Sequence, residues 1–186
     1  MQAAHRTAAL LSAITCASLT GCLHSGDTKD ASSTPGIPAA LQVPPNFVLS
    51  LKTQASGVQI YECAATKDDA SKYGWIFEAP QAELIDQSGS PIGRHYAGPT
   101  WDAADGSSVV GALKAKDDGP DPKAVPWLLL AAKTNGGEGV FSNVQYIQRL
   151  YTSGGKAPAD GCDQAHAGAE ANVPYKASYY FYSPIP

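Results

Sequence analysis

The chain has 186 residues, of which 44% are hydrophobic and 16% charged, and its formal net charge is −4. This composition predicts one soluble globular domain with a sizeable core, and the lack of any concentrated run of Lys or Arg argues against a nucleic-acid partner. The 18 Gly, 14 Pro and single Met favour a turn-rich fold over a helical bundle or coiled coil.

The first segment, residues 1–21, has the features of a bacterial lipoprotein signal peptide. It carries one cation, Arg6, no acidic residue, and an apolar stretch that is shorter than the roughly 20 residues needed to span a bilayer as a helix. The run Leu19-Thr20-Gly21-Cys22 resembles the lipobox, in which the cysteine thiol is lipidated and becomes the first residue after cleavage. A plain secretory signal with a chance cysteine is the alternative.

Lipidation of Cys22 would make the membrane the first partner of the chain. Because the rest of the chain is acidic and has no basic patch, the acyl chains would have to supply the attachment. The next residue is Leu23 rather than Asp, which in enteric-type bacteria usually leads to sorting to the outer membrane. We therefore expect a bacterial cell-envelope protein whose domain lies in the periplasm or at the cell surface.

Residues 22–45 are rich in Ser, Asp and Pro and contain few large apolar side chains. Such a segment buries too little surface to offset the entropy of ordering it, so the sequence predicts a flexible, lipid-anchored tether. The folded domain is expected over residues 46–186.

Short apolar runs separated by turn signals fill this domain, and the run at 127–132 predicts a strand covered on both faces. The predicted strands include residues 47–51, 58–63, 73–77, 84–85, 109–115, 127–132, 144–151 and 179–182, with turns at Asp86–Gly89, Asp105-Gly106 and Asn135-Gly136. Seven or eight strands without alternating long helices predict a single all-β domain, either a sandwich or a barrel. An alanine-rich stretch at 165–171 predicts one short helical turn.

Two cysteines, Cys63 and Cys162, remain after Cys16 leaves with the signal and Cys22 is lipidated. In an exported chain two such thiols most often pair, so we predict a disulfide. It would close a loop of about 100 residues, which the chain-entropy model values at up to roughly 4 to 5 kcal/mol. A metal site or a catalytic thiol is the alternative, although neither cysteine belongs to a CxxC pair.

No familiar catalytic or cofactor motif is present. The sequence lacks the dinucleotide fingerprint GxGxxG, the P-loop, the nucleophile elbow GxSxG and the zinc motif HExxH, so no cofactor is predicted. The polar candidates for a binding site are His95, Trp101 and Asp102 around a Gly-Pro turn, Arg149 within an apolar strand, and the pair His166 and Glu170, four residues apart.

These candidates allow more than one interpretation. His95, His166 and Glu170 would supply two imidazoles and a carboxylate to a divalent metal if the fold brought them together. Arg149 needs either a structural ion pair, which we favour, or an anionic ligand. Of the tryptophans, Trp75 and Trp127 are expected in the core and Trp101 at a binding surface.

Several short runs, taken together and in this order, resemble the domain of unknown function 3455 family over residues 43–182. They are His95-Tyr96-Ala97-Gly98-Pro99-Thr100-Trp101, Pro126-Trp127-Leu128-Leu129-Leu130, Gly139-Val140-Phe141-Ser142-Asn143-Val144, Ile147-Gln148-Arg149, Gly154-Gly155-Lys156-Ala157-Pro158 and Gly161-Cys162. The resemblance implies a domain found in bacteria and fungi, commonly behind an export signal, and it brings no established activity. A malate dehydrogenase label on some fungal relatives has no support here, because both the dinucleotide fingerprint and an α/β pattern are missing.

The sequence leads to two functional hypotheses. The first is a lipid-anchored envelope protein that acts as a binding or interaction module for a small molecule or an envelope partner. The second is a secreted, metal-assisted enzyme that uses His95, His166 and Glu170. A purely structural envelope component is a third, weaker alternative.

Overall fold

The structure is a computed structural model that describes residues 36–186, and within this range it contains eight strands and two short 3-10 turns. The strands are β1 (Phe47–Ala65), β2 (Tyr73–Ile85), β3 (Pro91–Tyr96), β4 (Thr100–Ala103), β5 (Ser108–Asp117), β6 (Trp127–Gly136), β7 (Tyr146–Gly154) and β8 (Glu170–Pro184). The 3-10 turns are η1 (Ala39–Leu41) and η2 (Gln164–His166). The predicted signal peptide, Cys22 and most of the predicted tether lie outside the described residues.

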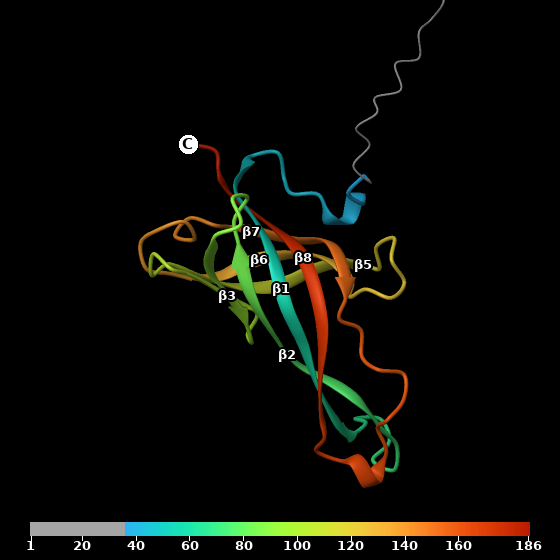
Figure 1. Ribbon diagram of the computed structural model, residues 1–186. Coiled ribbons are helices and arrows are strands. Elements are labelled where there is room, and N and C mark those ends of the chain that lie inside the picture. Colours follow the sequence, from blue (N-terminus) through green and yellow to red (C-terminus); the bar gives the residue numbers. More distant parts are fainter. Residues whose placement is uncertain (1–35) are drawn as a thin grey trace, which may run out of the picture. The chain divides into compact units, whose positions relative to one another are not determined.

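The eight strands form a closed antiparallel barrel in which each strand pairs with its neighbours in sequence, and β8 returns to pair with β1 (Figure 1). The predicted all-β class is confirmed, and of the two predicted architectures the structure has the barrel. Closure satisfies the hydrogen-bonding groups that an open sheet leaves free at its edges. An eight-stranded barrel has an interior that side chains fill or that holds one small ligand.

The barrel interior is built from alternate residues of each strand. On β8 the inward side chains Tyr175, Ala177, Tyr179 and Phe181 are all buried. The ring of Phe181 contacts Phe141 at a centroid distance of 4.7 Å and Trp101 at 6.0 Å, so aromatic groups from β4, β8 and the loop before β7 meet in one core.

A second, smaller core lies on the outer face of β6 and β7. Trp127, Leu129 and Leu150 pack there against Leu41 of η1, which is fully buried, and the Gln148 side-chain amide donates to the Leu41 carbonyl at 2.6 Å. The run at 127–132 therefore has both faces covered, as its uninterrupted apolar sequence indicated. The last part of the predicted tether, residues 36–45, differs from expectation, because Leu41 anchors it to the barrel wall.

Three strands continue beyond the barrel body and form what we call the arm: residues 59–65 of β1, 73–80 of β2 and 170–174 of β8 (Figure 1). The two separate strands predicted at 47–51 and 58–63 are one continuous strand, β1. Asn135-Gly136 does not form the predicted turn but ends β6.

The helical turn expected at 165–171 is shorter and lies earlier. It is the 3-10 turn η2, and Glu170 already belongs to β8. Within residues 36–186 no helix is long and apolar enough to cross a membrane.

Candidate functional site

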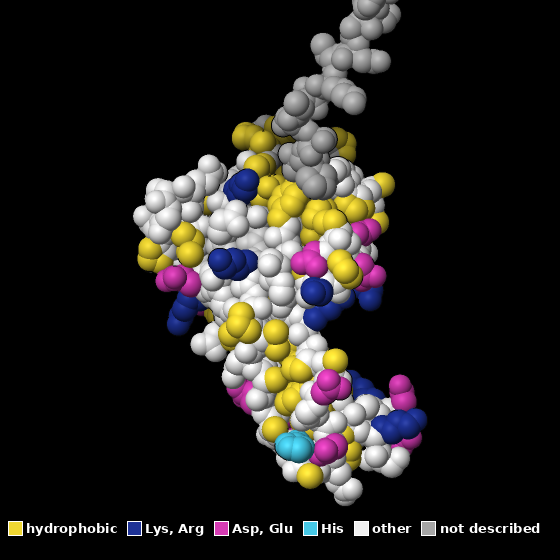
Figure 2. Space-filling view, turned by 45° about the vertical axis from the view of Figure 1, so that its right-hand side comes forward, with side chains coloured by type: hydrophobic (Ala, Val, Ile, Leu, Met, Phe, Trp, Pro, Cys, Tyr) yellow, Lys and Arg dark blue, Asp and Glu magenta, His cyan; other side chains and the backbone are white. Residues whose placement is uncertain are grey.

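A cavity of the described domain lies where the barrel body joins the arm, and the surface is hollowed between these two parts (Figure 2). It has a volume of about 420 Å³, within the range of small-molecule sites. Its wall is largely apolar, with Trp101, Leu128 and Leu130 from the barrel and Tyr61 and Phe77 from the arm. The shape and chemistry suit a small organic molecule.

Arg149 is the only lysine or arginine that lines this cavity. It lies on β7 opposite Leu128 of β6 and Tyr179 of β8, and its Nε donates to the Pro126 carbonyl at 3.0 Å. The structural ion pair that we favoured for Arg149 is not formed with any carboxylate among residues 36–186. A half-buried guanidinium therefore faces the cavity with its charge unpaired by the described domain.

Several buried polar atoms around Arg149 have no hydrogen-bond partner. They are Gln59 Nε2, Trp101 Nε1 and the hydroxyls of Tyr175 and Tyr179. Gln59, Trp101 and Tyr179 line the cavity, and all four residues are at least 98% buried. The Tyr175 hydroxyl lies close to the Tyr179 hydroxyl and to the Gln59 side chain, and the Tyr179 hydroxyl lies close to Arg149, but none of these contacts has both the distance and the angle of a hydrogen bond. Burial, the dominant effect, raises the pKa of both tyrosines, so they are neutral at physiological pH.

His95 lines the cavity as a neutral imidazole. Its ring stacks on Trp101 at a centroid distance of 4.4 Å and meets the Tyr179 ring at 5.0 Å. Burial, opposed by the bond to Thr100 and reinforced by the nearby charge of Arg149, lowers its pKa to about 3. The Thr100 carbonyl accepts from Nδ1 at 2.8 Å, so the proton resides on Nδ1 and Nε2 is an acceptor.

Two glycines allow the aromatic wall to close. A Cβ atom at Gly111 would lie 3.0 Å from Trp101 Cζ3 and 3.1 Å from Leu130 Cδ2. Glycine at this position therefore lets the Trp101 indole pack closely against β5. Gly155 has a φ of +83°, and its carbonyl accepts from the Tyr61 hydroxyl at 2.6 Å. The loop that contains Gly155 thereby holds the Tyr61 side chain in place on the arm side of the cavity.

The other predicted site residues lie elsewhere. Asp102 follows the inward Trp101 and is on the opposite face of β4, where it accepts from the Tyr96 hydroxyl at 2.7 Å and lies 4.0 Å from Arg94. His166 and Glu170 are exposed and belong to η2 and the start of β8. The structure thus brings His95, Trp101 and Arg149 together but not Asp102, His166 or Glu170.

The metal-assisted hypothesis has no assembled site in the described domain. No three His, Cys, Asp or Glu side chains among residues 36–186 are grouped so that they would hold a metal ion. His95 is buried in the barrel, whereas His166 pairs with Asp163 and Glu170 accepts from the Asn172 amide. The three proposed ligands do not form one cluster.

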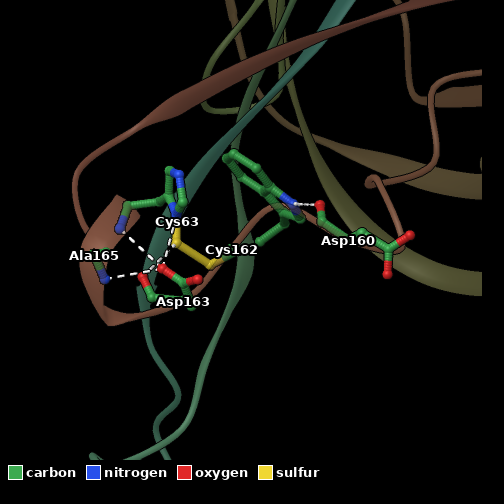
Figure 3. Close-up of polar contacts among 7 residues, drawn as sticks. Cys63, Asp160, Cys162, Asp163 and Ala165 are labelled. Carbon is green, nitrogen blue, oxygen red and sulfur yellow. Dashed lines mark hydrogen bonds and ion pairs between the residues drawn. A yellow bond between two sulfur atoms is a disulfide. The ribbon is translucent and has the colours of Figure 1, made fainter.

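The end of the arm is held by the predicted disulfide, which is confirmed between Cys63 and Cys162 (Figure 3). Beside it, Asp163 begins η2, and its carboxylate accepts from the backbone amides of Ala165 and His166 and lies 2.7 Å from His166 Nδ1. The hydrogen bond from His166 is the main reason that the pKa of Asp163 is lowered. These contacts make the arm end a structural element rather than part of the cavity.

Sequence reasoning missed Gln59, Tyr61, Phe77 and Tyr179 as cavity residues. A usable signal existed for Gln59, because it is a polar residue at an inward position of β1 between Gly57 and Tyr61. Trp75, expected in the core, is half-buried on the arm and donates to the Asp160 carbonyl at 2.9 Å. Trp101, expected at a surface, is buried in the cavity wall instead.

The fold and this cavity define a class of protein: an eight-stranded antiparallel barrel with a largely apolar cavity where the barrel body meets the arm. The model of the family described as "Protein of unknown function (DUF3455)" matches residues 44–183. The chain belongs to this family, and the match covers all eight strands nearly to their ends. No curated protein and no solved structure matches the chain.

Proposed function

We propose that this protein is an exported, lipid-anchored binding protein that holds a small organic molecule in the cavity between its barrel and its arm. One observation carries the proposal: Gln59, Trp101 and Tyr179 place buried, unpartnered polar atoms around the same cavity as the unpaired guanidinium of Arg149. This concentration of unmet polar groups in one place is what a ligand would satisfy.

The energetic argument rests on the cost of such atoms. A buried donor without a partner costs roughly 1 to 3 kcal/mol, and native structures leave few of them. If these groups served only the fold, apolar side chains of similar size could replace them without loss of stability. Their persistence beside a cavity of about 420 Å³ is therefore better explained by binding than by packing.

The runs that carry the family resemblance support the same site. Three of them contribute to the cavity wall: residues 95–101 supply His95 and Trp101, residues 126–130 supply Leu128, and residues 147–149 supply Arg149. The proposed site is thus built in part from the segments on which the resemblance to the family rests.

The anchor is proposed from the sequence of residues 1–22, with support from the disulfide. A Cys63–Cys162 bond is typical of an oxidising compartment such as the periplasm. In cells, we expect Cys22→Ala or treatment with globomycin to abolish membrane retention of the mature form, while Cys16→Ala leaves it intact. Unchanged fractionation of the Cys22→Ala chain would reject the anchor.

The binding proposal can be tested through the tryptophans, since the chain has three and each gives one indole N–H signal in a ¹⁵N spectrum. The full chain with Cys22→Ala, which removes the lipid acceptor, is titrated with 2-naphthamide, a neutral aromatic probe, and the Trp101 signal is assigned with Trp101→Phe. We expect a saturable shift of the Trp101 signal at one probe per chain. Trp75 is the internal control, because its indole already donates to Asp160. If the Trp101 signal does not respond to the neutral probe or to its carboxylate counterpart, the cavity is not a binding site.

A further inference from the structure

We propose that the ligand is an organic acid whose carboxylate is held by Arg149 and whose flat apolar body lies against Trp101 and His95. This inference rests on the proposed binding function and adds the chemical class of the ligand. It depends on three properties of the cavity: the hydrogen-bonding sense of its unpartnered atoms, its charge, and the shape of its walls.

The unpartnered atoms are nearly all donors. Trp101 Nε1 and Gln59 Nε2 can only donate, and a tyrosine hydroxyl such as that of Tyr179 is able to donate. The Arg149 guanidinium donates from its Nε to Pro126 and lies beside the Tyr179 hydroxyl, and among residues 36–186 it forms no ion pair, so its terminal nitrogens also offer donors to a ligand. A ligand group that satisfies this set must be an acceptor with several lone pairs, and a carboxylate has two oxygens that match the fork of a guanidinium.

The charge of the cavity points the same way. Arg149 is the one permanent cation among the lining residues, and Glu78 is the one carboxylate. Glu78 is exposed and forms no ion pair with Arg149. His95, Tyr61 and Tyr179 are neutral because burial disfavours their charged forms. Because Glu78 is exposed to solvent, the half-buried charge of Arg149 is the one that an anionic ligand in the cavity would neutralise.

The walls of the cavity indicate the shape and polarity of the rest of the ligand. His95 and Trp101 are stacked with an interplanar angle of 10°, and Phe77 and Leu113, both largely exposed, continue the apolar surface outward. A flat aromatic or other rigid apolar body would contact these faces. An acid with a long polar chain, such as a sugar acid, would leave its hydroxyls against apolar side chains.

The test compares two probes of the same shape, 2-naphthoate and 2-naphthamide, on the full chain with Cys22→Ala, by the Trp101 indole signal and by calorimetry. We expect the carboxylate to bind at least about tenfold more tightly than the amide, as for a charge-assisted pair. Arg149→Met should reduce the ratio of naphthoate to naphthamide affinity to about twofold or less, and Arg149→Lys should keep only part of that ratio because lysine lacks the planar fork. Arg94→Met is the matched control, since Arg94 lies on β3 with an exposed side chain outside this cavity, and it should change nothing.

The outcomes separate this inference from the function on which it rests. Equal binding of both probes to the parent chain would overturn the acid assignment while the binding proposal stands, whereas binding of neither would overturn both. If Arg149→Met fails to fold, Glu78→Gln at the rim gives an independent answer. Removing that negative charge should tighten naphthoate about twofold and leave the amide unchanged, and no change for naphthoate would count against the proposal.

Discussion

The barrel body and the arm are parts of the same strands, yet they are held together in different ways. In the body every strand pairs on both sides, and the inner face closes on itself around a core of buried aromatic residues. In the arm, β2 pairs with β1 from residue 73 onward, but its pairing with β3 begins only at Ala82. The arm therefore has an unpaired strand edge, and a disulfide with a capped turn holds its end.

This difference explains where the cavity lies and how its two sides behave. Arg149, Trp101 and His95 stand on barrel strands whose positions are fixed by closure. Tyr61 and Phe77 belong to the arm, and the Phe77 side chain is 49% exposed. We infer a rigid side that sets ligand chemistry and a softer side that adapts to the size of the ligand. The following substitutions compare the two regions directly.

The largest expected effect is from Phe181→Ala in the barrel core. Phe181 is fully buried and contacts the rings of Trp101 and Phe141, so its removal leaves a cavity that the closed barrel cannot easily collapse. We expect the free energy of unfolding, measured by urea denaturation, to fall by about 3 to 5 kcal/mol. The same substitution on the arm, Phe77→Ala, should cost less than about 1 kcal/mol, because the side chain is half exposed already. Equal losses at the two sites would contradict the contrast between body and arm.

Removal of the disulfide should cause the second-largest loss in the free energy of unfolding. The Cys63→Ala, Cys162→Ala double variant loses a crosslink between residues 99 positions apart, which we expect to cost about 2 to 4 kcal/mol. Hydrogen exchange should show where the loss falls: amides of residues 59–65 and 170–174 exchange faster by local opening, while β5 and β6 stay protected relative to global unfolding. Uniform acceleration across β5 and β6 would show that the arm is no separate unit.

A pH titration probes His95 on the rigid side. Its pKa is lowered to about 3 in the fold against an ordinary value of 6.5, so the unfolded chain binds a proton that the folded chain does not. Stability is therefore complete above about pH 6.5 and falls as the pH is lowered toward 3. Between pH 7 and pH 5 we expect a loss of about 2 kcal/mol.

The control for this titration is His95→Phe, which keeps a ring against Trp101 but cannot titrate. Its stability should change little between pH 7 and pH 5, because the carboxylates with lowered pKa, such as Asp105 and Asp163, remain ionised there. A variant with the same pH dependence as the parent chain would show that another group is responsible.

Much of the fold was accessible from the sequence because strand alternation and turn residues are local signals. The terminal aromatic run and the apolar run at 127–132 led directly to β8 and β6. What local signals do not contain is closure: the pairing of β1 with β8 joins residues more than a hundred positions apart. The merging of two runs into one 19-residue β1 was missed for the same reason, since the polar and small residues 52–57 look like a break unless a partner on each side continues through them.

The site was only partly predictable. His95, Trp101 and Arg149 stood out as polar or bulky residues in unusual surroundings, and the barrel does bring them together. His166 and Glu170 matched a helical spacing, but η2 is too short for that spacing to apply. The partner choice of Arg149 could not be settled either, because an ion pair depends on which carboxylates the closed barrel places nearby, and those of the described domain lie elsewhere.

The smallest expected effects on stability come from two exposed aspartates, one in each region, whose carboxylates accept hydrogen bonds from backbone amides. Asp163 accepts from the amides of Ala165 and His166 at the arm end, whereas Asp105 accepts from the amide and hydroxyl of Ser107 and, across loops, from the Val140 amide. These hydrogen bonds hold the pKa of each carboxyl below its ordinary value, so their stabilising contribution is present at neutral pH and is lost as the pH falls through the lowered pKa. Asp163→Ala should speed amide exchange only around η2. Asp105→Ala should also loosen residues 137–142, because it ties two loops of the barrel body together. If Asp163→Ala disturbed the barrel loops as much as Asp105→Ala does, the arm end would be coupled to the body more tightly than its one-sided pairing implies.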